Sequence, residues 1–337
     1  MNDTKILYLF LFFATHVAFG QAEPHEWMNI SGTTIEAKFI RADADTVTLF
    51  MKGRNFDVKL SDLKPDSQAL ARKLSTPEPS IEPKAAVKEK KSFPEIRVIK
   101  ADWGGASLRD IGKVLNSSAR QLWSHASQEE FKPIIVDRSR TGPIVLFRRG
   151  NEGQYIVRLD THKTFWSQYA FQFSHEFCHI MCGYKAGDQS NQWFEESLCE
   201  TASLFAMRRM RKEWEEKPPY PNWKSYAPAL EKYAQERLDS HAWRESLTVA
   251  EWYDNNKEKL KENPTDREKN TTIATKLLPL FEQRPENWGS VAFLNVHKTK
   301  DSRGFSTYLA DWRRACKLAR DKEFVSKLAR MFGVEKS

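Results

Sequence analysis

The chain has 337 residues, of which 40% are hydrophobic, 12% aromatic and 29% charged, a composition typical of a globular protein with one to three domains. Its formal net charge of +8 is spread along the sequence, and no nucleic-acid-binding motif accompanies it. We therefore expect solubility and weak attraction to anionic surfaces, and no nucleic-acid partner.

The first 22 residues differ from the rest of the chain. Lys5 is followed by an apolar run and then by small residues before Glu23, which is the order of a secretory signal peptide. Residues 1–22 are therefore predicted to be a signal peptide, and the protein to be secreted or periplasmic. The alternative is a retained N-terminal anchor. No second apolar stretch reaches membrane length, so no membrane span is expected after removal of the signal.

Residues 23–75 predict a small β domain. Apolar and polar residues alternate in "TIEAKFI", "TVTLFMK" and "NFDVKL", as in strands that bury one face. The segments "ADAD" and "KGRN" fall between these strands as turns, and "KPDSQALARKL" predicts a short closing helix.

The order of a Trp, a turn, three alternating strands, "LSDL" and a helix with "DSQA" resembles a small SH3-like barrel. It is similar to the first homology domain of the yeast actin-assembly adaptor. The resemblance implies a binding or spacer module that contacts a partner or an envelope polymer, and it carries no catalytic residue. Residues 76–93 are rich in Pro and charge and predict a linker, because such a composition cannot bury a core.

Residues 94–337 predict a larger α+β domain. "PEIRVIKA", "KPIIVDRS", "GPIVLFRRG" and "QYIVRLDT" have the pattern of strands, and "SLRDIGKVLNSSARQLWSHA" that of a helix. The stretch "FSHEFCHIMCGY" follows on a second helix, and after a loop comes a third, "WFEESLCETASLFAMRRMRKEW". The remaining chain, from about residue 220, is expected to be helical.

The quoted stretch places His175, Glu176 and His179 in the order H-E-x-x-H. Residues four apart on a helix point the same way, so His175 and His179 are spaced to hold one zinc ion. Glu176 lies a quarter turn to one side, where its carboxylate can act as a general base on a water molecule at the metal.

Zinc in a catalytic site needs a third protein ligand. Glu196 and Glu200 share one stripe of the next helix, whereas Glu195 points about 100° away from that stripe. Gly183 suits the end of the preceding helix, so the short loop after it can bring the two polar stripes together. We expect one Zn²⁺ held by His175, His179 and Glu196.

These residues resemble the gluzincin branch of zinc metallopeptidases, which pairs H-E-x-x-H with a Glu on the next helix, often within W-x-x-E. "WFEESLCE" fits that pattern at Trp193 and Glu196, although Ser197 stands where the family often has Gly. The resemblance implies a zincin-like fold over about residues 94–210, with "QYIVRLDT" as the edge strand that holds an extended peptide. It also implies that Glu200 hydrogen-bonds a ligand His.

The cysteines leave alternatives open. Cys182 lies three residues after His179 on the same stripe, and a His-His-Cys set closed by a fourth ligand would make a structural metal site. Cys178 or Cys182 could form a disulfide with Cys199, and plain buried thiols are the other alternative. Cys316 is the fourth cysteine.

The expected function is that of an exported zinc metallopeptidase, which hydrolyses a peptide or protein through a metal-activated water with Glu176 as general base. The alternative is a catalytically degenerate zincin-like binding or scaffold protein of the cell envelope. The gluzincin resemblance also implies a Tyr or His that stabilises the oxyanion. The sequence offers five candidates for it: Tyr184, Tyr226, Tyr233, His241 and Tyr253.

Overall fold

The computed structural model describes residues 24–75, 91–243 and 246–335. The chain divides into two compact units between residues 88 and 89, inside the segment expected to be the linker. The expected signal peptide and residues 76–90 of the expected linker lie outside the described residues. Among the helices of the described ranges, none is long and apolar enough to cross a membrane.

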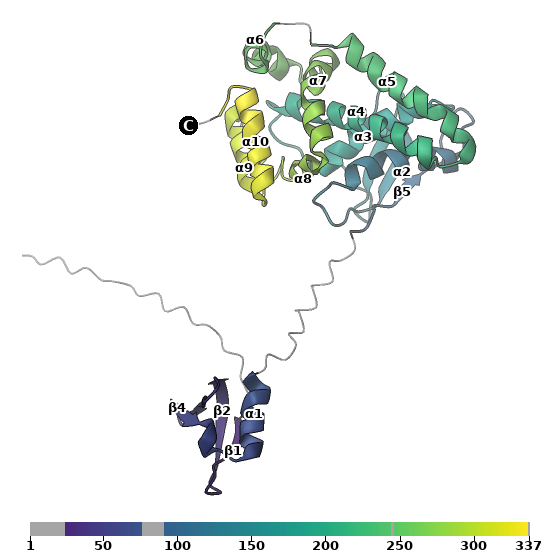
Figure 1. The fold of residues 1–337 in the computed structure, drawn as a ribbon. Coiled ribbons are helices and arrows are strands. Elements are labelled where there is room, and N and C mark those ends of the chain that lie inside the picture. Colours follow the sequence, from purple (N-terminus) through teal and green to yellow (C-terminus); the bar gives the residue numbers. More distant parts are fainter. Residues whose placement is uncertain (1–23, 76–90, 244–245, 336–337) are drawn as a thin grey trace, which may run out of the picture. The chain divides into compact units, whose positions relative to one another are not determined.

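The smaller unit is an antiparallel sheet of four strands with one helix (Figure 1). The strands follow each other in the order of the chain, and the alternating pattern predicted the last three of them. The elements are β1 (Pro24–Met28), β2 (Thr34–Ala42), β3 (Thr46–Met51), β4 (Arg54–Lys59), a 3-10 turn at Leu60–Asp62 and α1 (Pro65–Ser75).

The expected closed barrel is not formed by the described strands of this unit, because β1 and β4 remain at opposite edges of an open sheet. Trp27 is fully buried in the small core, and its indole N–H donates to the carbonyl of Ala37 at 3.0 Å. Helix α1 packs against β2 and β1, and Asn29 pairs with Leu63 in a single bridge. The helix therefore covers this core in place of further strand pairing.

The larger unit begins with a four-stranded mixed sheet in the order β5-β6-β8-β7. Strands β5, β6 and β8 run parallel, and β7 is antiparallel to β8. The strands are β5 (Ile96–Val98), β6 (Ile134–Arg138), β7 (Ile144–Val145) and β8 (Tyr155–Leu159).

The expected edge strand was assigned wrongly. "QYIVRLDT" forms β8, which lies inside the sheet, and the short strand β7 takes the edge beside it. Val145 of β7 pairs with Val157 of β8 in antiparallel register. The resemblance implied that this strand takes the edge, whereas the hairpin that β7 forms with β8 puts the earlier strand outside.

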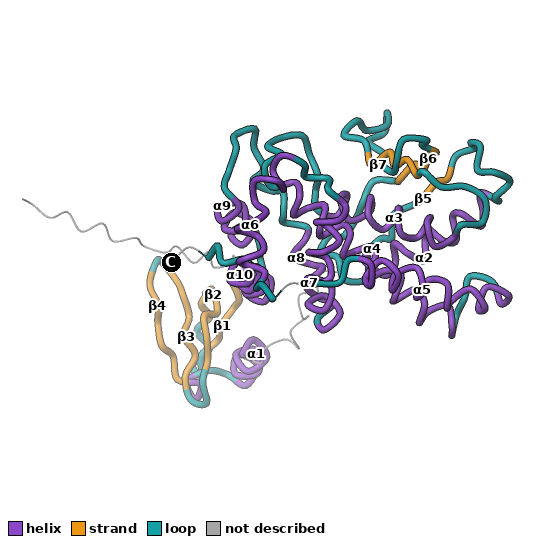
Figure 2. Tube along the Cα trace, turned by 90° about the horizontal axis from the view of Figure 1, so that it is seen from above, coloured by secondary structure: helices purple, strands orange, loops and turns teal. Residues whose placement is uncertain are grey.

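Helices make up most of the larger unit and lie to one side of its sheet (Figure 2). They are α2 (Leu108–Trp123), α3 (Trp166–Met181), α4 (Gln192–Glu216), α5 (Ala227–Ser240), α6 (Val249–Glu262), α7 (Arg267–Gln283), α8 (Trp288–Val291), α9 (Phe305–Ala315) and α10 (Ala319–Met331). The mixed α+β class predicted from the sequence is therefore observed.

Helix α4 is the centre of the larger unit, packed against α3, α7, α5 and α2 (Figure 1). Its side chains are buried along almost its whole length, from Trp193 to Trp214. Helix α3 ends as expected, because Gly183 adopts a left-handed φ of 62° and the Tyr184 N–H donates to the carbonyl of His179. The next residues then return the chain, so that α4 lies beside α3.

Candidate metal centre

Helix α3 carries a polar stripe that faces away from the core. Trp166, Ala170, Phe173 and Phe177 are buried on the other side of the helix. On the polar stripe, Gln172 is fixed by a reciprocal pair of 2.9 Å hydrogen bonds with the backbone of Asp160, at the end of β8. This contact ties α3 to the sheet and sets where the next turns of the polar stripe point.

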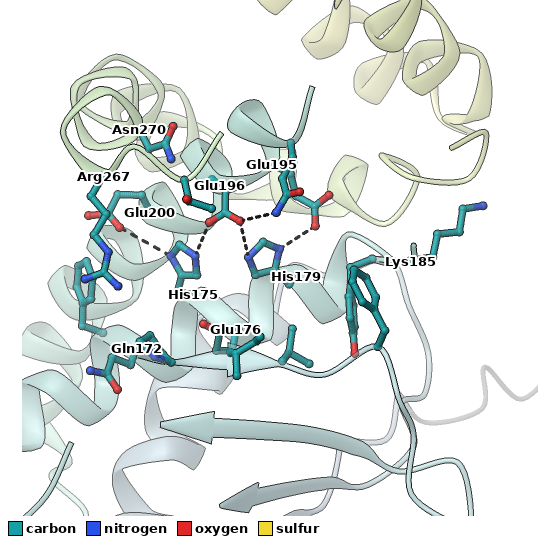
Figure 3. A pocket seen from close by; sticks show the side chains of 18 of the residues that line it. Gln172, His175, Glu176, His179, Lys185, Glu195, Glu196, Glu200, Arg267 and Asn270 are labelled. Carbon is teal, nitrogen blue, oxygen red and sulfur yellow. Dashed lines mark hydrogen bonds and ion pairs between the residues drawn. The ribbon is translucent and has the colours of Figure 1, made fainter. Parts of the chain in front are cut away.

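The Nε2 atoms of His175 and His179 both face Glu196 of α4 (Figure 3). One carboxylate oxygen of Glu196 lies 3.1 Å from Nε2 of His175, and the other lies 3.6 Å from Nε2 of His179. The amide of Gln192 donates to the second of these oxygens at 3.1 Å. The structure therefore brings together the three residues that the sequence predicted as metal ligands.

The other ring nitrogen of His179 contacts Glu195, which sequence reasoning did not assign to the site. Nδ1 of His179 lies 2.7 Å from Glu195, whose second oxygen accepts from the Asn295 amide at 2.9 Å. Lys298 lies 3.9 Å from the same carboxylate. A carboxylate at Nδ1 fixes the tautomer that leaves Nε2 free for a metal.

The other ring nitrogen of His175 faces Glu200, the residue for which the sequence predicted such a contact. The two groups form an ion pair with Nδ1 3.8 Å from the carboxylate. Glu200 accepts from the hydroxyl of Thr271 at 3.0 Å and lies 3.4 Å from the guanidinium of Arg237. Both imidazoles are thus held from behind by a buried carboxylate, and each carboxylate is held by the C-terminal helical region.

The position of Glu195 explains why it was missed. A quarter turn separates it from Glu196 on α4, which suggested that it faces elsewhere. The two imidazoles lie side by side along α3, so neighbouring carboxylates on α4 reach opposite nitrogens of the same ring. The two adjacent acidic residues in "WFEE" were the only sign in the sequence that Glu195 belongs to the site. Nothing in the sequence indicated that Asn295 and Lys298 contact it.

Close carboxylates strongly favour the protonated imidazoles when no metal is bound. Burial opposes the charged form of His175, but hydrogen bonds with Glu196 and Glu200 outweigh it and raise its pKa to about 10. Burial likewise opposes charge on Glu196, yet His179 and His175 hold its pKa well below the usual range. The cluster is therefore a strong site for positive charge.

Glu176 lies below the two imidazoles on the side of the strands (Figure 3). It is 3% exposed, and burial raises its pKa despite the opposing charges of His175 and His179. The backbone N–H of Val145 in β7 is hydrogen-bonded to it. A carboxylate with a raised pKa beside a candidate metal site has the property required of a proton acceptor.

A cavity of about 320 Å³ opens over these groups. Edge strand β7 borders it with Ile144 and Val145, and Tyr184 and Tyr233 line its walls. Of the other oxyanion candidates, the hydroxyl of Tyr226 contacts Ser167, and neither His241 nor Tyr253 lines the cavity. The choice is therefore reduced to Tyr184 and Tyr233.

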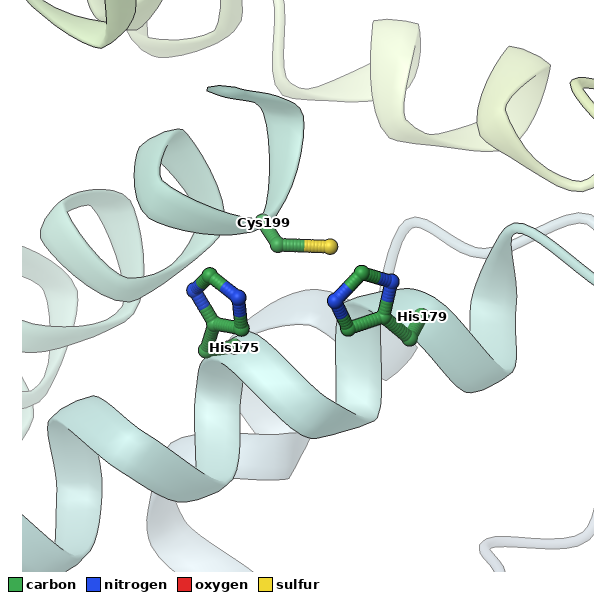
Figure 4. A group of neighbouring side chains, drawn as sticks. All are labelled: His175, His179 and Cys199. Carbon is green, nitrogen blue, oxygen red and sulfur yellow. The ribbon is translucent and has the colours of Figure 1, made fainter. Parts of the chain in front are cut away.

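All four cysteines are buried and have free thiols. The sulfur of Cys199 lies within 4.8 Å of a ring nitrogen of both His175 and His179 (Figure 4). Cys182, the alternative ligand suggested by the sequence, is grouped instead with Cys178 and Cys199. The sequence placed Cys182 on the histidine stripe because of its spacing, but it lies at the C-terminal end of α3, one turn beyond His179.

The donor set fits a divalent cation. Four carboxylates meet here, and the described basic side chains ion-paired with them are Arg237 and Lys298. Two buried negative charges therefore need compensation by imidazolium or by a metal. Two imidazole nitrogens and one carboxylate, each backed by hydrogen-bonded neighbours, are ligands typical of zinc.

Comparisons of the chain with protein-family models, curated proteins and solved structures give no match.

Proposed function

We propose that the larger unit is a zinc-dependent peptidase of the gluzincin type with a zincin-like fold. In this proposal His175, His179 and Glu196 hold the zinc, and Glu176 is the general base. The observation that supports it best is the convergence of both Nε2 atoms on Glu196 beside the cavity that Glu176 lines. Cys199 is the alternative third ligand, since its sulfur lies within 4.8 Å of a ring nitrogen of both histidines, whereas the oxygens of Glu196 lie 3.1 and 3.6 Å from the two Nε2 atoms.

When bound, zinc supplies a Lewis acid that polarises a carbonyl and increases the acidity of water. Glu176 accepts the proton from the attacking water and passes it to the leaving amine, a role that its raised pKa favours. Edge strand β7 can bind an extended peptide by adding it to the sheet, because the outer side of β7 has no partner among the described strands.

Tyr233 is the better candidate for oxyanion stabilisation. The hydroxyl of Tyr184 already donates to the carbonyl of Leu146. The hydroxyl of Tyr233 accepts from Arg237 at 3.4 Å, so its own proton remains available to a developing oxyanion in the cavity.

The expectations for the rest of the chain are part of this proposal. The protein is exported through residues 1–22, and the N-terminal unit binds a partner or an envelope polymer. Its four-stranded sheet and small core around Trp27 support an independent module.

The first test of the proposal is the zinc content of the purified full chain and of Glu196→Ala. We expect about one zinc per parent chain and clearly less in the variant. Glu216→Ala is the matched control, because Glu216 is exposed on the same helix. Full zinc in Glu196→Ala together with loss in Cys199→Ala would transfer the third-ligand role to Cys199.

The second test is hydrolysis of a quenched fluorescent peptide library by the parent chain and by Glu176→Gln. We expect the variant to keep its zinc and to lose roughly 10³-fold or more in turnover, since it removes the proton acceptor. Zinc binding without hydrolysis in the parent would favour the degenerate scaffold instead.

A further inference from the structure

A second group of metal-ligating side chains lies at the α3–α4 interface and has no role in the proposed peptidase. Cys178 and Cys182 are one turn apart on α3, and Cys199 faces them from α4. All three are 0% exposed, and their sulfur atoms lie within 4.8 Å of one another.

The spacing of the three sulfurs fits a bound ion better than it fits a disulfide. A disulfide needs two sulfurs at about 2.05 Å and leaves the third thiol over. An ion with metal–sulfur distances of about 2.3 Å holds its thiolates roughly 4 Å apart. Three free sulfurs within 4.8 Å of one another are compatible with one ion bound by all three.

We propose that Cys178, Cys182 and Cys199 form a thiolate site for a soft d¹⁰ cation, Cu⁺ being the ion suited to three sulfur ligands. Binding forms three metal–sulfur bonds and releases the thiol protons to solvent, with no change in oxidation state. The site does not depend on the peptidase proposal, because Cys178 and Cys182 have no role there and Cys199 is only the alternative to Glu196 as third zinc ligand.

Position and ligand chemistry separate the two sites. The imidazole–carboxylate group has nitrogen and oxygen donors and opens to the cavity, whereas the cysteines do not line that cavity. Cys199 is their common neighbour, since its sulfur also lies within 4.8 Å of ring nitrogens of His175 and His179. A metal at the thiolate site would therefore change the electrostatic environment of the two imidazoles.

The test is an anaerobic titration of the reduced full chain with Cu⁺ against a chromogenic Cu⁺ chelator. Because the sulfurs are fully buried, Cu⁺ is supplied both to the folded chain and during refolding. We expect each chain to keep one equivalent of Cu⁺ in the presence of the chelator. The complex should also show an absorption band from thiolate-to-copper charge transfer. X-ray absorption at the copper edge of the wild-type chain should show three sulfur neighbours and no nitrogen.

Variants decide which residues hold the ion. Cys178→Ala and Cys182→Ala, each checked for folding by circular dichroism, should weaken Cu⁺ binding by at least about 100-fold, the upper end of the effect of losing a contact to a metal ligand. Cys316→Ala is the matched buried control and should change nothing. His175→Ala/His179→Ala should keep the copper.

Three results would overturn the site. One is nitrogen in the copper coordination shell. Another is loss of Cu⁺ in the double histidine variant, which would place the ion at the imidazoles. The third is a count of two rather than four thiols in the unfolded, metal-free chain, which would mean that a disulfide has formed.

Discussion

The helix pair α3–α4 holds two groups of ligating side chains built by the same rule. Each has two residues one turn apart on α3, His175 with His179 and Cys178 with Cys182, and each is completed from α4. They differ in surroundings. Each imidazole of the first group contacts a carboxylate through both ring nitrogens and the group borders a cavity, whereas the second group is buried among apolar side chains.

The difference shows that spacing creates the opportunity for a metal site and surroundings decide its chemistry. The carboxylates around the imidazoles favour a hard or borderline divalent ion. One of them, Glu176, can also serve as a proton acceptor beside that ion. The apolar environment of the thiols favours a soft ion and excludes substrate. The following predictions test whether the two groups behave independently.

Of these predictions, Tyr233→Phe has the largest expected effect, and it should affect only the imidazole group. Loss of one oxyanion donor lowers turnover by about 10²–10³-fold. Zinc content and unfolding temperature should stay near those of the parent, because the hydroxyl does not contact the proposed ligands. Tyr184→Phe is the control from the same cavity. Equal losses in both variants would contradict the assignment of Tyr233.

Glu195→Gln and Glu200→Gln should each weaken zinc binding by about 10–100-fold, because each removes the charge behind one ligand imidazole. Zinc affinity is measured by competition with a chelator. We expect Cu⁺ binding by the thiols to remain as in the parent. The stronger effect should come from Glu195, whose oxygen is 2.7 Å from His179, whereas Glu200 is 3.8 Å from His175.

The metal-free chain should lose stability as the pH rises from about 6.5 to about 10. His175 keeps its proton up to about pH 10 in the folded chain, whereas the ordinary value is 6.5. Within that window the folded state binds the proton that the unfolded state has released, so raising the pH favours unfolding. Thermal unfolding after chelator treatment measures this slope, and His175→Gln should reduce it. An unchanged slope in the variant would assign it to other groups.

Cys182→Ala should have the smallest effect on the imidazole group. Removing a buried sulfur leaves a small void, and we expect a loss of about 1–2 kcal/mol in the free energy of unfolding. Zinc content and peptide turnover should be unchanged. A marked loss of zinc in this variant would show that the two groups are coupled through Cys199.

Much of the local structure follows from the sequence. Period-two alternation placed β2, β3 and β4 of the smaller unit, the sequence pattern also indicated the strands before α3, and Gly183 marked the end of that helix correctly. The H-E-x-x-H spacing placed two imidazoles on one face of α3, and the Glu196–Glu200 stripe placed two carboxylates opposite them. These features depend on helix and strand periodicity, which is a local property of the chain.

Only the tertiary structure decided the rest. The sheet of the smaller unit stays open because α1 covers its core, and β7 takes the edge of the second sheet because it forms a hairpin with β8. Glu195 joins the site, and Asn295 and Lys298 hold it from about 100 residues further along the chain. Cys199 lies near both imidazoles, whereas the sequence offered Cys182 as the alternative ligand. Contacts between residues far apart in the sequence depend on how helices pack, and no local pattern encodes that packing.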